Sequence, residues 1–110
     1  MKKIYLFCSA GMSTSLLANK MQECANGYKI PVEVKAFPHS EIDNIVKTFS
    51  PDCILLGPQV RYTLEETKKL YGGDGTPVAV IDTNDYGLMK AENVLKMAVV
   101  LIKSSSKNKK

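Results

Sequence analysis

Four short apolar runs alternate with amphipathic segments along this chain, and this alternation restricts the possible folds most strongly. The runs cover residues 4–7, 31–37, 52–56 and 78–81, and the first and last are apolar without interruption. Continuous apolar runs of this length are typical of strands buried on both faces. Strands that alternate with helices indicate a parallel sheet with right-handed crossovers and helices on both faces. We therefore expect an α/β fold with four parallel strands.

The segments between the runs have the periodicity of helices. Apolar residues share one face of residues 13–24, which predicts the first helix. Ser40 is expected to cap the second helix, because serine side chains accept hydrogen bonds from the first helical N–H groups. Two further helices are predicted over residues 60–71 and 88–102, and Leu88 begins the apolar face of the last one.

The charged residues are distributed unevenly. Of the 15 lysines and arginines, four lie among the last eight residues, so residues 1–102 carry as many acidic as basic side chains. The net charge of +4 therefore belongs to the C-terminus, which argues against nucleic acid as a partner. Residues 104–110 contain no apolar side chain, so we expect a disordered basic tail after a single domain over residues 1–103.

Composition excludes several other classes. No apolar run approaches the roughly 18–20 residues of a membrane span, so we expect no direct membrane insertion. The apolar stretch near the N-terminus is too short for a signal peptide, which predicts a cytoplasmic protein. The cysteines, Cys8, Cys24 and Cys53, are widely spaced and accompanied by one histidine, His39. This argues against a disulfide framework or a metal site and leaves room for one functional thiol.

The loop of residues 8–15 is the first candidate for a ligand site. A parallel α/β sheet binds ligands beyond the carboxyl ends of its strands, and this loop follows the first strand. Backbone N–H groups at a strand-to-helix turn form a cradle for an anion. Gly11 allows a left-handed turn, and four hydroxyls surround it. The predicted phosphate-binding residues are Ser9, Ala10, Gly11, Met12, Ser13, Thr14 and Ser15.

Cys8 lies at the mouth of this predicted cradle. A helix N-terminus favours the thiolate form of a cysteine, and the thiolate is the form that attacks phosphorus. The simpler interpretation is a small core cysteine followed by an ordinary serine cap. That interpretation does not explain why one glycine and four hydroxyls follow Cys8 within seven residues. We therefore interpret Cys8 as a nucleophile.

The segment YLFCSAGMSTSLL, residues 5–17, resembles the active-site segment of a known family. That family is enzyme IIB of the bacterial phosphoenolpyruvate-dependent sugar phosphotransferase system, of the lactose/cellobiose/chitobiose type. Three shorter motifs resemble it in the same order, and the likeness runs from about residue 2 to residue 102. These motifs are AFP at 36–38, LLGPQ at 55–59, and VID at 80–82 followed by YG at 86–87.

The resemblance implies a fold, a reaction and two partners. The fold would be a three-layer domain with strand order 2-1-3-4, similar to the low-molecular-weight tyrosine phosphatases and to flavodoxin-like proteins. Cys8 would accept a phosphoryl group from a phosphohistidine of the IIA component. It would then pass the group to a disaccharide, such as cellobiose or chitobiose, translocated by the membrane IIC component. No metal and no organic cofactor is implied.

The same loop resembles that of low-molecular-weight tyrosine phosphatases, in which a cysteine, five residues, an arginine and a hydroxyl residue follow one another. Cys8 and Ser15 match the thiolate and hydroxyl positions, but Thr14 stands where the arginine would be. A phosphatase needs a fixed guanidinium to stabilise its transition state. The alternative function, a phosphatase or arsenate reductase that uses Cys8 as nucleophile, is therefore less favoured than a carrier.

Other residues at the predicted ligand edge receive weaker assignments. Met12 at the loop apex, Pro58 and Gln59 are candidates for partner binding. Asp82 most simply caps the turn after the fourth strand, although it could also tune Cys8. His39 is expected to be solvated, and Arg61 could reach the site from the third loop.

Overall fold

The central strand of the sheet is β1 (Lys2–Cys8), and it pairs on both sides. In the computed structural model, which describes residues 1–9 and 11–105 but not the side chains of 11–13, β1 lies between β2 (Val32–Pro38) and β3 (Cys53–Leu56). The fourth strand, β4 (Val78–Val80), pairs with β3. All pairs are parallel, which confirms the predicted order 2-1-3-4.

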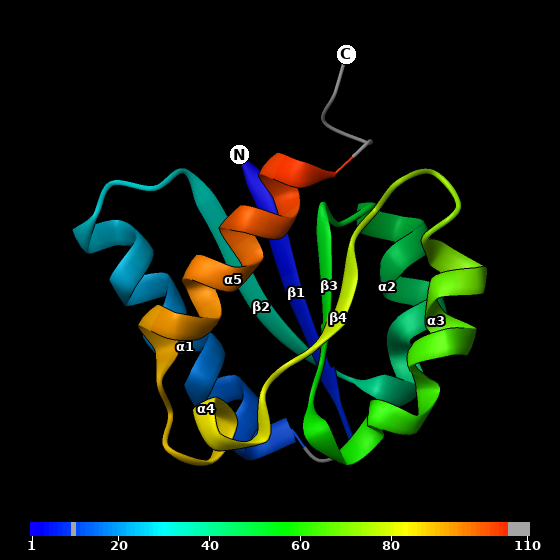
Figure 1. Cartoon of the computed structure of the whole chain (residues 1–110), viewed down its shortest axis with the longest axis horizontal. Coiled ribbons are helices and arrows are strands. Elements are labelled where there is room, and N and C mark those ends of the chain that lie inside the picture. Colours follow the sequence, from blue (N-terminus) through cyan, green and yellow to red (C-terminus); the bar gives the residue numbers. More distant parts are fainter. Residues whose placement is uncertain (10, 106–110) are drawn as a thin grey trace.

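Helices cover both faces of the sheet (Figure 1). Helices α1 (Gly11–Gly27) and α5 (Ala91–Ser104) lie on one face, and α2 (Ile42–Phe49) and α3 (Leu64–Tyr71) lie on the other. Successive side chains of a strand point to opposite faces, so β1 supplies both cores. The first core gathers Ile4, Leu6, Leu17, Met21 and Leu95, and the second gathers Tyr5, Phe7, Ile42 and Val60.

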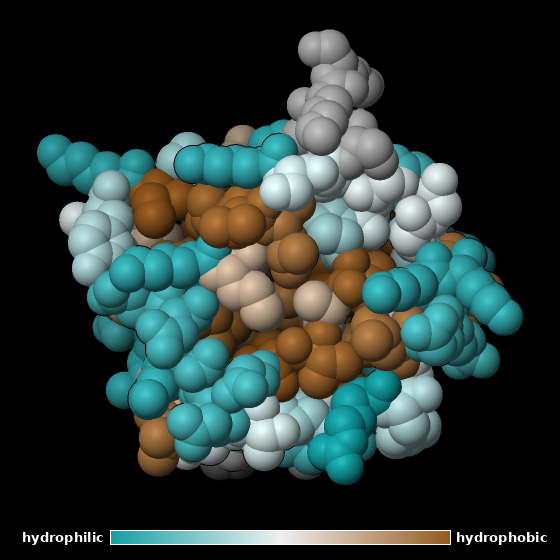
Figure 2. Space-filling model, in the orientation of Figure 1, coloured by the Kyte–Doolittle hydropathy of each residue, from teal (hydrophilic) through white to brown (hydrophobic). Residues whose placement is uncertain are grey.

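The two edge strands of the sheet, β2 and β4, are less buried than the two central strands. Helix α1 packs mainly on β2, whereas α5 contacts β3. In the view of Figure 2, apolar side chains gather at the centre of the surface, over α5 and β4, within a polar rim. Ala79 and Val80 of β4, which pack against opposite cores, are only half-buried. The two central strands are therefore the best covered, because β3 is buried throughout and β1 is buried from Ile4 to Cys8.

The carboxyl ends of the strands meet at one edge of the sheet, at the bottom of Figure 1. The pairing register places Cys8 opposite Pro38, and Phe7 opposite Leu56. Leu56 in turn lies opposite Val80. The loops after all four strands therefore lie at the same edge, as the alternation of elements predicts.

The segment after β4 differs from the prediction. A short helix, α4 (Thr83–Gly87), precedes α5, and the backbone turns through a left-handed conformation at Met89 (φ 53°). This turn breaks the helical phase, so Leu88 lies outside the last helix and is 62% exposed. The prediction that Leu88 begins the apolar face of that helix is therefore wrong.

Two helix starts also differ. A 3₁₀ turn, η1 (His39–Glu41), precedes α2, and no side chain caps that helix, so the predicted Ser40 cap is wrong. A second 3₁₀ segment, η2 (Pro58–Thr63), precedes α3. Val60 within η2 has a non-helical backbone and a buried side chain. Periodicity finds such residues because they are buried, but it does not distinguish the two kinds of helix.

Helix α5 and a buried serine continue slightly beyond the predicted domain boundary. Ser104 is the last residue of α5, and Ser105 is buried, with its hydroxyl donating to the Gly75 carbonyl. The remaining residues of the predicted tail, 106–110, lie outside the described residues. Within residues 1–9 and 11–105, no helix combines the length and apolar character needed to cross a bilayer.

The edge strand β2 is protected by a side chain of α1. The Gln22 amide donates to the Val32 carbonyl (3.0 Å) and accepts from the Val34 N–H (2.8 Å). Both backbone groups belong to the edge of β2 that has no neighbouring strand. Unpaired edge groups invite pairing with another chain, so Gln22 both stabilises and shields this strand.

Replacing Gln22 with alanine should lower the free energy of unfolding by about 1–3 kcal/mol, because two hydrogen bonds of about 0.5–1.5 kcal/mol are lost. Urea denaturation followed by circular dichroism measures the change. The control is Glu23→Ala on the same helix, since Glu23 is exposed. Equal stability of the two variants would show that the Gln22 bonds contribute nothing.

Candidate active site

Cys8 ends β1 and is completely buried. The backbone pairing continues past the end of β3, since the Gly57 N–H donates to the Phe7 carbonyl at 2.8 Å. Helix α1 begins three residues after Cys8, at Gly11. The first N–H groups of a helix have no partner within it, so this terminus provides donors beside the strand end.

The Cys8 sulfur accepts a hydrogen bond from Thr14. Thr14 lies in the first turn of α1 and is completely buried, and its Oγ1 is 2.6 Å from Cys8 Sγ. A donor in this position stabilises negative charge on the sulfur. Ser15, which matches the hydroxyl position of the phosphatase pattern, is exposed instead. The hydroxyl on the sulfur therefore comes from the residue that replaces the phosphatase arginine.

A second hydroxyl joins this pair from a distant part of the chain. Tyr86 of α4 is almost completely buried, and its hydroxyl oxygen is 3.0 Å from Thr14 Oγ1. Tyr86 belongs to the YG motif at residues 86–87, and the sequence predicts no role for it. Its one available signal was a lone aromatic residue within a polar stretch that follows a buried strand.

Gly57 allows the third loop to approach Cys8 closely. A Cβ atom on Gly57 would lie 2.9 Å from the Cys8 Cβ and 2.9 Å from Gln59 Oε1. Both distances are shorter than side-chain carbons tolerate, so any larger residue would displace a neighbour. In the sequence, Gly57 belongs to the LLGPQ motif, and its contact with Cys8 joins residues that are 49 positions apart.

The remaining predicted loop residues divide into two groups. Ser9 and Ser15 are exposed at the ligand edge, where their hydroxyls are accessible to an anion. Ala10 and the side chains of Gly11, Met12 and Ser13 lie outside the described residues. The backbone of residues 11–13 forms the first turn of α1 and thus belongs to the helix N-terminus.

The third loop brings one partner-binding candidate to the surface and buries the other. Gln59 is exposed, and its side chain lies beside Gly57 and hence near Cys8. Pro58 is buried at the start of η2, so its ring offers little surface to a partner. Arg61 is exposed in the same 3₁₀ segment.

Asp82 and His39 follow strands at the same edge. Asp82 is exposed and caps α4, since its carboxylate accepts the Asp85 N–H at 3.1 Å. His39 was expected to be solvated, but it is half-buried, and its buried Nε2 has no hydrogen-bond partner among the described residues. The capping interpretation of Asp82 is confirmed, and the solvated interpretation of His39 is wrong.

The other cysteines lie away from the ligand edge. Cys53 begins β3 at the opposite end of the strand, and burial raises the pKa of its thiol to about 12, with a smaller contribution from Asp52. It therefore stays protonated at neutral pH and cannot act as a nucleophile there. Cys24 is half-buried near the end of α1. Within the described part of the chain, Cys8 is thus the cysteine whose sulfur accepts a hydrogen bond from a side-chain hydroxyl.

The family model of the lactose/cellobiose-specific IIB subunit of the PTS system matches residues 3–97. The cellobiose-specific EIIB component of Lactococcus lactis subsp. lactis is 42% identical over 100 residues, covering 88% of this chain and 93% of that protein. The oligo-beta-mannoside-specific EIIB component of Bacillus subtilis is 34% identical over 102 residues, covering 93% and 97% respectively.

Solved structures have the same fold. The cellobiose-specific phosphotransferase IIB component of Borrelia burgdorferi superposes with a TM-score of 0.75 at 32% identity, covering 96% of this chain and 94% of that one. The lactose-specific IIB domain of Streptococcus pneumoniae superposes with a TM-score of 0.76 at 24% identity, covering 89% and 94%. The chain therefore belongs to the lactose/cellobiose-specific IIB subunit family of the phosphotransferase system.

Proposed function

We propose that Cys8 carries a phosphoryl group between two partners in sugar uptake. The donor is a phosphohistidine of the IIA component, and the acceptor is a disaccharide, such as cellobiose or chitobiose, held by the membrane IIC component. The observation that supports this proposal best is the Thr14 hydroxyl on the buried Cys8 sulfur, beside the N-terminus of α1. Family membership supports the same role.

Each transfer exchanges one bond to phosphorus for another. In the first, a lone pair of the Cys8 thiolate forms the S–P bond while the P–N bond to the donor imidazole breaks, and its electron pair stays on the imidazole nitrogen. In the second, a sugar hydroxyl oxygen forms the P–O bond while the S–P bond breaks. The electron pair returns to sulfur, and a general base of the IIC component takes the hydroxyl proton.

The residues around Cys8 suit both transfers, from the donor to the sulfur and from the sulfur to the acceptor. Negative charge on sulfur exists before the first transfer and again after the second, and the Thr14 hydroxyl stabilises it at both moments. The helix N-terminus stabilises the charge on the phosphoryl oxygens. The exposed hydroxyls of Ser9 and Ser15 offer further donors at the surface.

The phosphoryl group must survive in water between its two partners. Hydrolysis by a phosphatase uses a guanidinium fixed in the loop and a carboxylic acid beside the leaving group. The loop has Thr14 in place of the arginine, and Thr14 contacts the sulfur. Asp82 accepts the Asp85 N–H instead of being free for this role. These features favour the carrier over the phosphatase or arsenate reductase.

Partners are proposed to dock over the carboxyl edge of the sheet, because donor and acceptor must approach Cys8 in line with the S–P bond. The exposed Gln59 lies on this edge, and Met12 is proposed to contact partners from the first turn of α1. Asp82 is proposed to influence Cys8 only through the helix that it caps.

The Cys8→Ser variant should lose phosphorylation by IIA completely and keep its fold, because a serine hydroxyl at neutral pH is not a thiolate. Intact mass after incubation with phosphoenolpyruvate, the general components and IIA measures the added phosphate. Cys24→Ser is the control, since Cys24 lies on α1 away from the edge, and it should be labelled like the wild type. If the Cys8→Ser variant is labelled as strongly as the wild type, Cys8 is not the phosphorylated residue.

The wild-type protein should not turn over p-nitrophenyl phosphate, because no arginine stands at the transition-state position of its loop. Release of p-nitrophenol is followed by absorbance with an authentic low-molecular-weight phosphatase as positive control. Turnover that disappears in the Cys8→Ser variant would favour the phosphatase function instead.

The Gly57→Ala variant should transfer phosphate about tenfold more slowly, because its Cβ displaces Cys8 and small displacements of reacting groups have large effects on rate. Rapid-quench measurement of Cys8 phosphorylation tests this. Gly73→Ala is the matched control, since a Cβ there meets nothing within 4 Å. Identical rates for both variants would show that close approach at Gly57 is not needed.

A further inference from the structure

Tyr86 contacts the candidate nucleophile only through another side chain. Its ring packs in the core that α1 and α5 share with the sheet, and its hydroxyl is hydrogen-bonded to Thr14 Oγ1 at 3.0 Å. Thr14 Oγ1 is in turn 2.6 Å from Cys8 Sγ. Three groups from β1, α1 and α4 thus form a continuous buried chain that ends at the sulfur.

The single hydrogen of the Thr14 hydroxyl determines which group donates in each of these two hydrogen bonds. A threonine hydroxyl has a single hydrogen and two lone pairs. When Thr14 donates that hydrogen to Cys8 Sγ, the contact with Tyr86 can be a hydrogen bond only if the tyrosine hydroxyl donates to Thr14 Oγ1. Without Tyr86, the Thr14 hydroxyl is free to rotate away from the sulfur.

We propose that Tyr86 is a positioning residue for phosphoryl transfer at Cys8, because its hydroxyl holds the Thr14 hydrogen on the sulfur. The inference rests on the proposed function and adds a residue to its machinery. These two hydrogen bonds act most strongly when the Cys8 sulfur is negative. The sulfur is negative before it accepts the phosphoryl group and again as the group departs. Hydrogen bonds in series polarise one another, so the tyrosine strengthens the donation that it directs.

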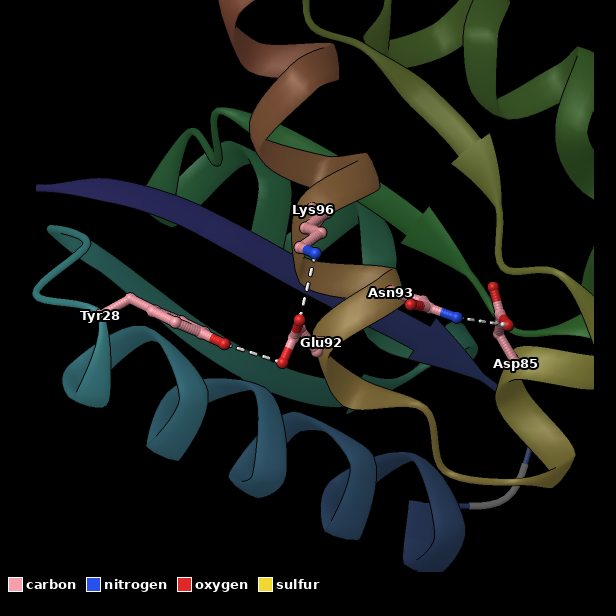
Figure 3. A network of polar contacts seen from close by, with 5 residues as sticks. All are labelled: Tyr28, Asp85, Glu92, Asn93 and Lys96. Atoms are coloured by element: carbon pink, nitrogen blue, oxygen red, sulfur yellow. Dashed lines mark hydrogen bonds and ion pairs between the residues drawn. The ribbon is translucent and has the colours of Figure 1, made fainter.

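The surroundings of α4 support this role, because a five-residue helix needs outside contacts to hold a side chain in place. Asp82 caps its start, and the Asp85 carbonyl accepts the Lys90 N–H at 2.8 Å. The Asn93 side chain of α5 reaches Asp85 Oδ1 at 3.3 Å, as Figure 3 shows. These contacts fix both ends of the short helix that carries Tyr86.

Helix α5 is itself anchored to Tyr28, the residue that directly follows α1. Tyr28 donates to Glu92 at 2.9 Å, and Glu92 also pairs with Lys96 at 3.1 Å (Figure 3). The same α1 carries Thr14 at its other end. The hydroxyls of Thr14 and Tyr86 therefore belong to helices that are tied together directly and through α5.

The test compares Tyr86→Phe with Tyr5→Phe. Each change removes one hydroxyl from a buried ring, and the Tyr5 hydroxyl bonds to Glu33 at 2.7 Å, outside the chain that ends at Cys8. Single-turnover phosphorylation is measured over a range of phosphorylated IIA concentrations. Tyr86→Phe should lower the rate at saturation roughly three- to tenfold, the effect of one hydrogen bond, and leave the half-saturating concentration unchanged. Tyr5→Phe should stay within about twofold of the wild type.

A double-mutant cycle shows whether Tyr86 acts through Thr14. Thr14→Val removes the hydroxyl, so adding Tyr86→Phe to it should cause no further loss of phosphorylation rate. Thr14→Ser keeps a hydroxyl, so in that background Tyr86→Phe should lower the rate again. An equal loss from Tyr86→Phe in the Thr14→Val background would overturn the proposal, as would a normal rate for Tyr86→Phe alone. A wild-type protein that takes no phosphate on Cys8 would refute the proposed function itself, and labelling of the wild type separates the two failures.

Discussion

Burial of β1 on both faces is the constraint from which the position of the site follows. Its residues from Ile4 to Cys8 are almost completely buried. Ile4 and Leu6 face one core, and Tyr5 and Phe7 face the other. A strand in this position cannot shift by one residue without moving every side chain to the wrong face. The register therefore places Cys8 at the end of the strand, where the chain leaves the sheet and turns into α1.

The site combines a rigid base with an open edge. The base consists of Cys8, the Thr14 hydroxyl and the close approach of Gly57, all of which are buried. The edge consists of exposed groups, among them Ser9, Ser15 and Gln59. Such a division suits a phosphoryl carrier, because the nucleophile must be held in one geometry while different partners reach it in turn.

The change from arginine to threonine in the loop has two physical consequences at once. It removes the cation that a phosphatase uses to stabilise its transition state. It also supplies a short hydroxyl that is buried beside the sulfur and donates to it. Thr14 thus places a hydrogen-bond donor on the sulfur and leaves the loop without a guanidinium.

Local patterns in the sequence determined the strands, their parallel pairing and the position of Cys8 at the end of the first strand. Each of these depends on runs of neighbouring residues, such as the apolar stretch of residues 4–7 and the hydroxyl-rich loop after it. The contacts of Thr14 with Tyr86 and of Gly57 with Cys8 were decided only by tertiary structure, because they join residues 72 and 49 positions apart. The error at Leu88 has the same cause, since a left-handed turn at Met89 breaks a periodicity that the sequence alone continues. Periodicity reports which side of an element is buried, whereas packing decides which side chains meet there.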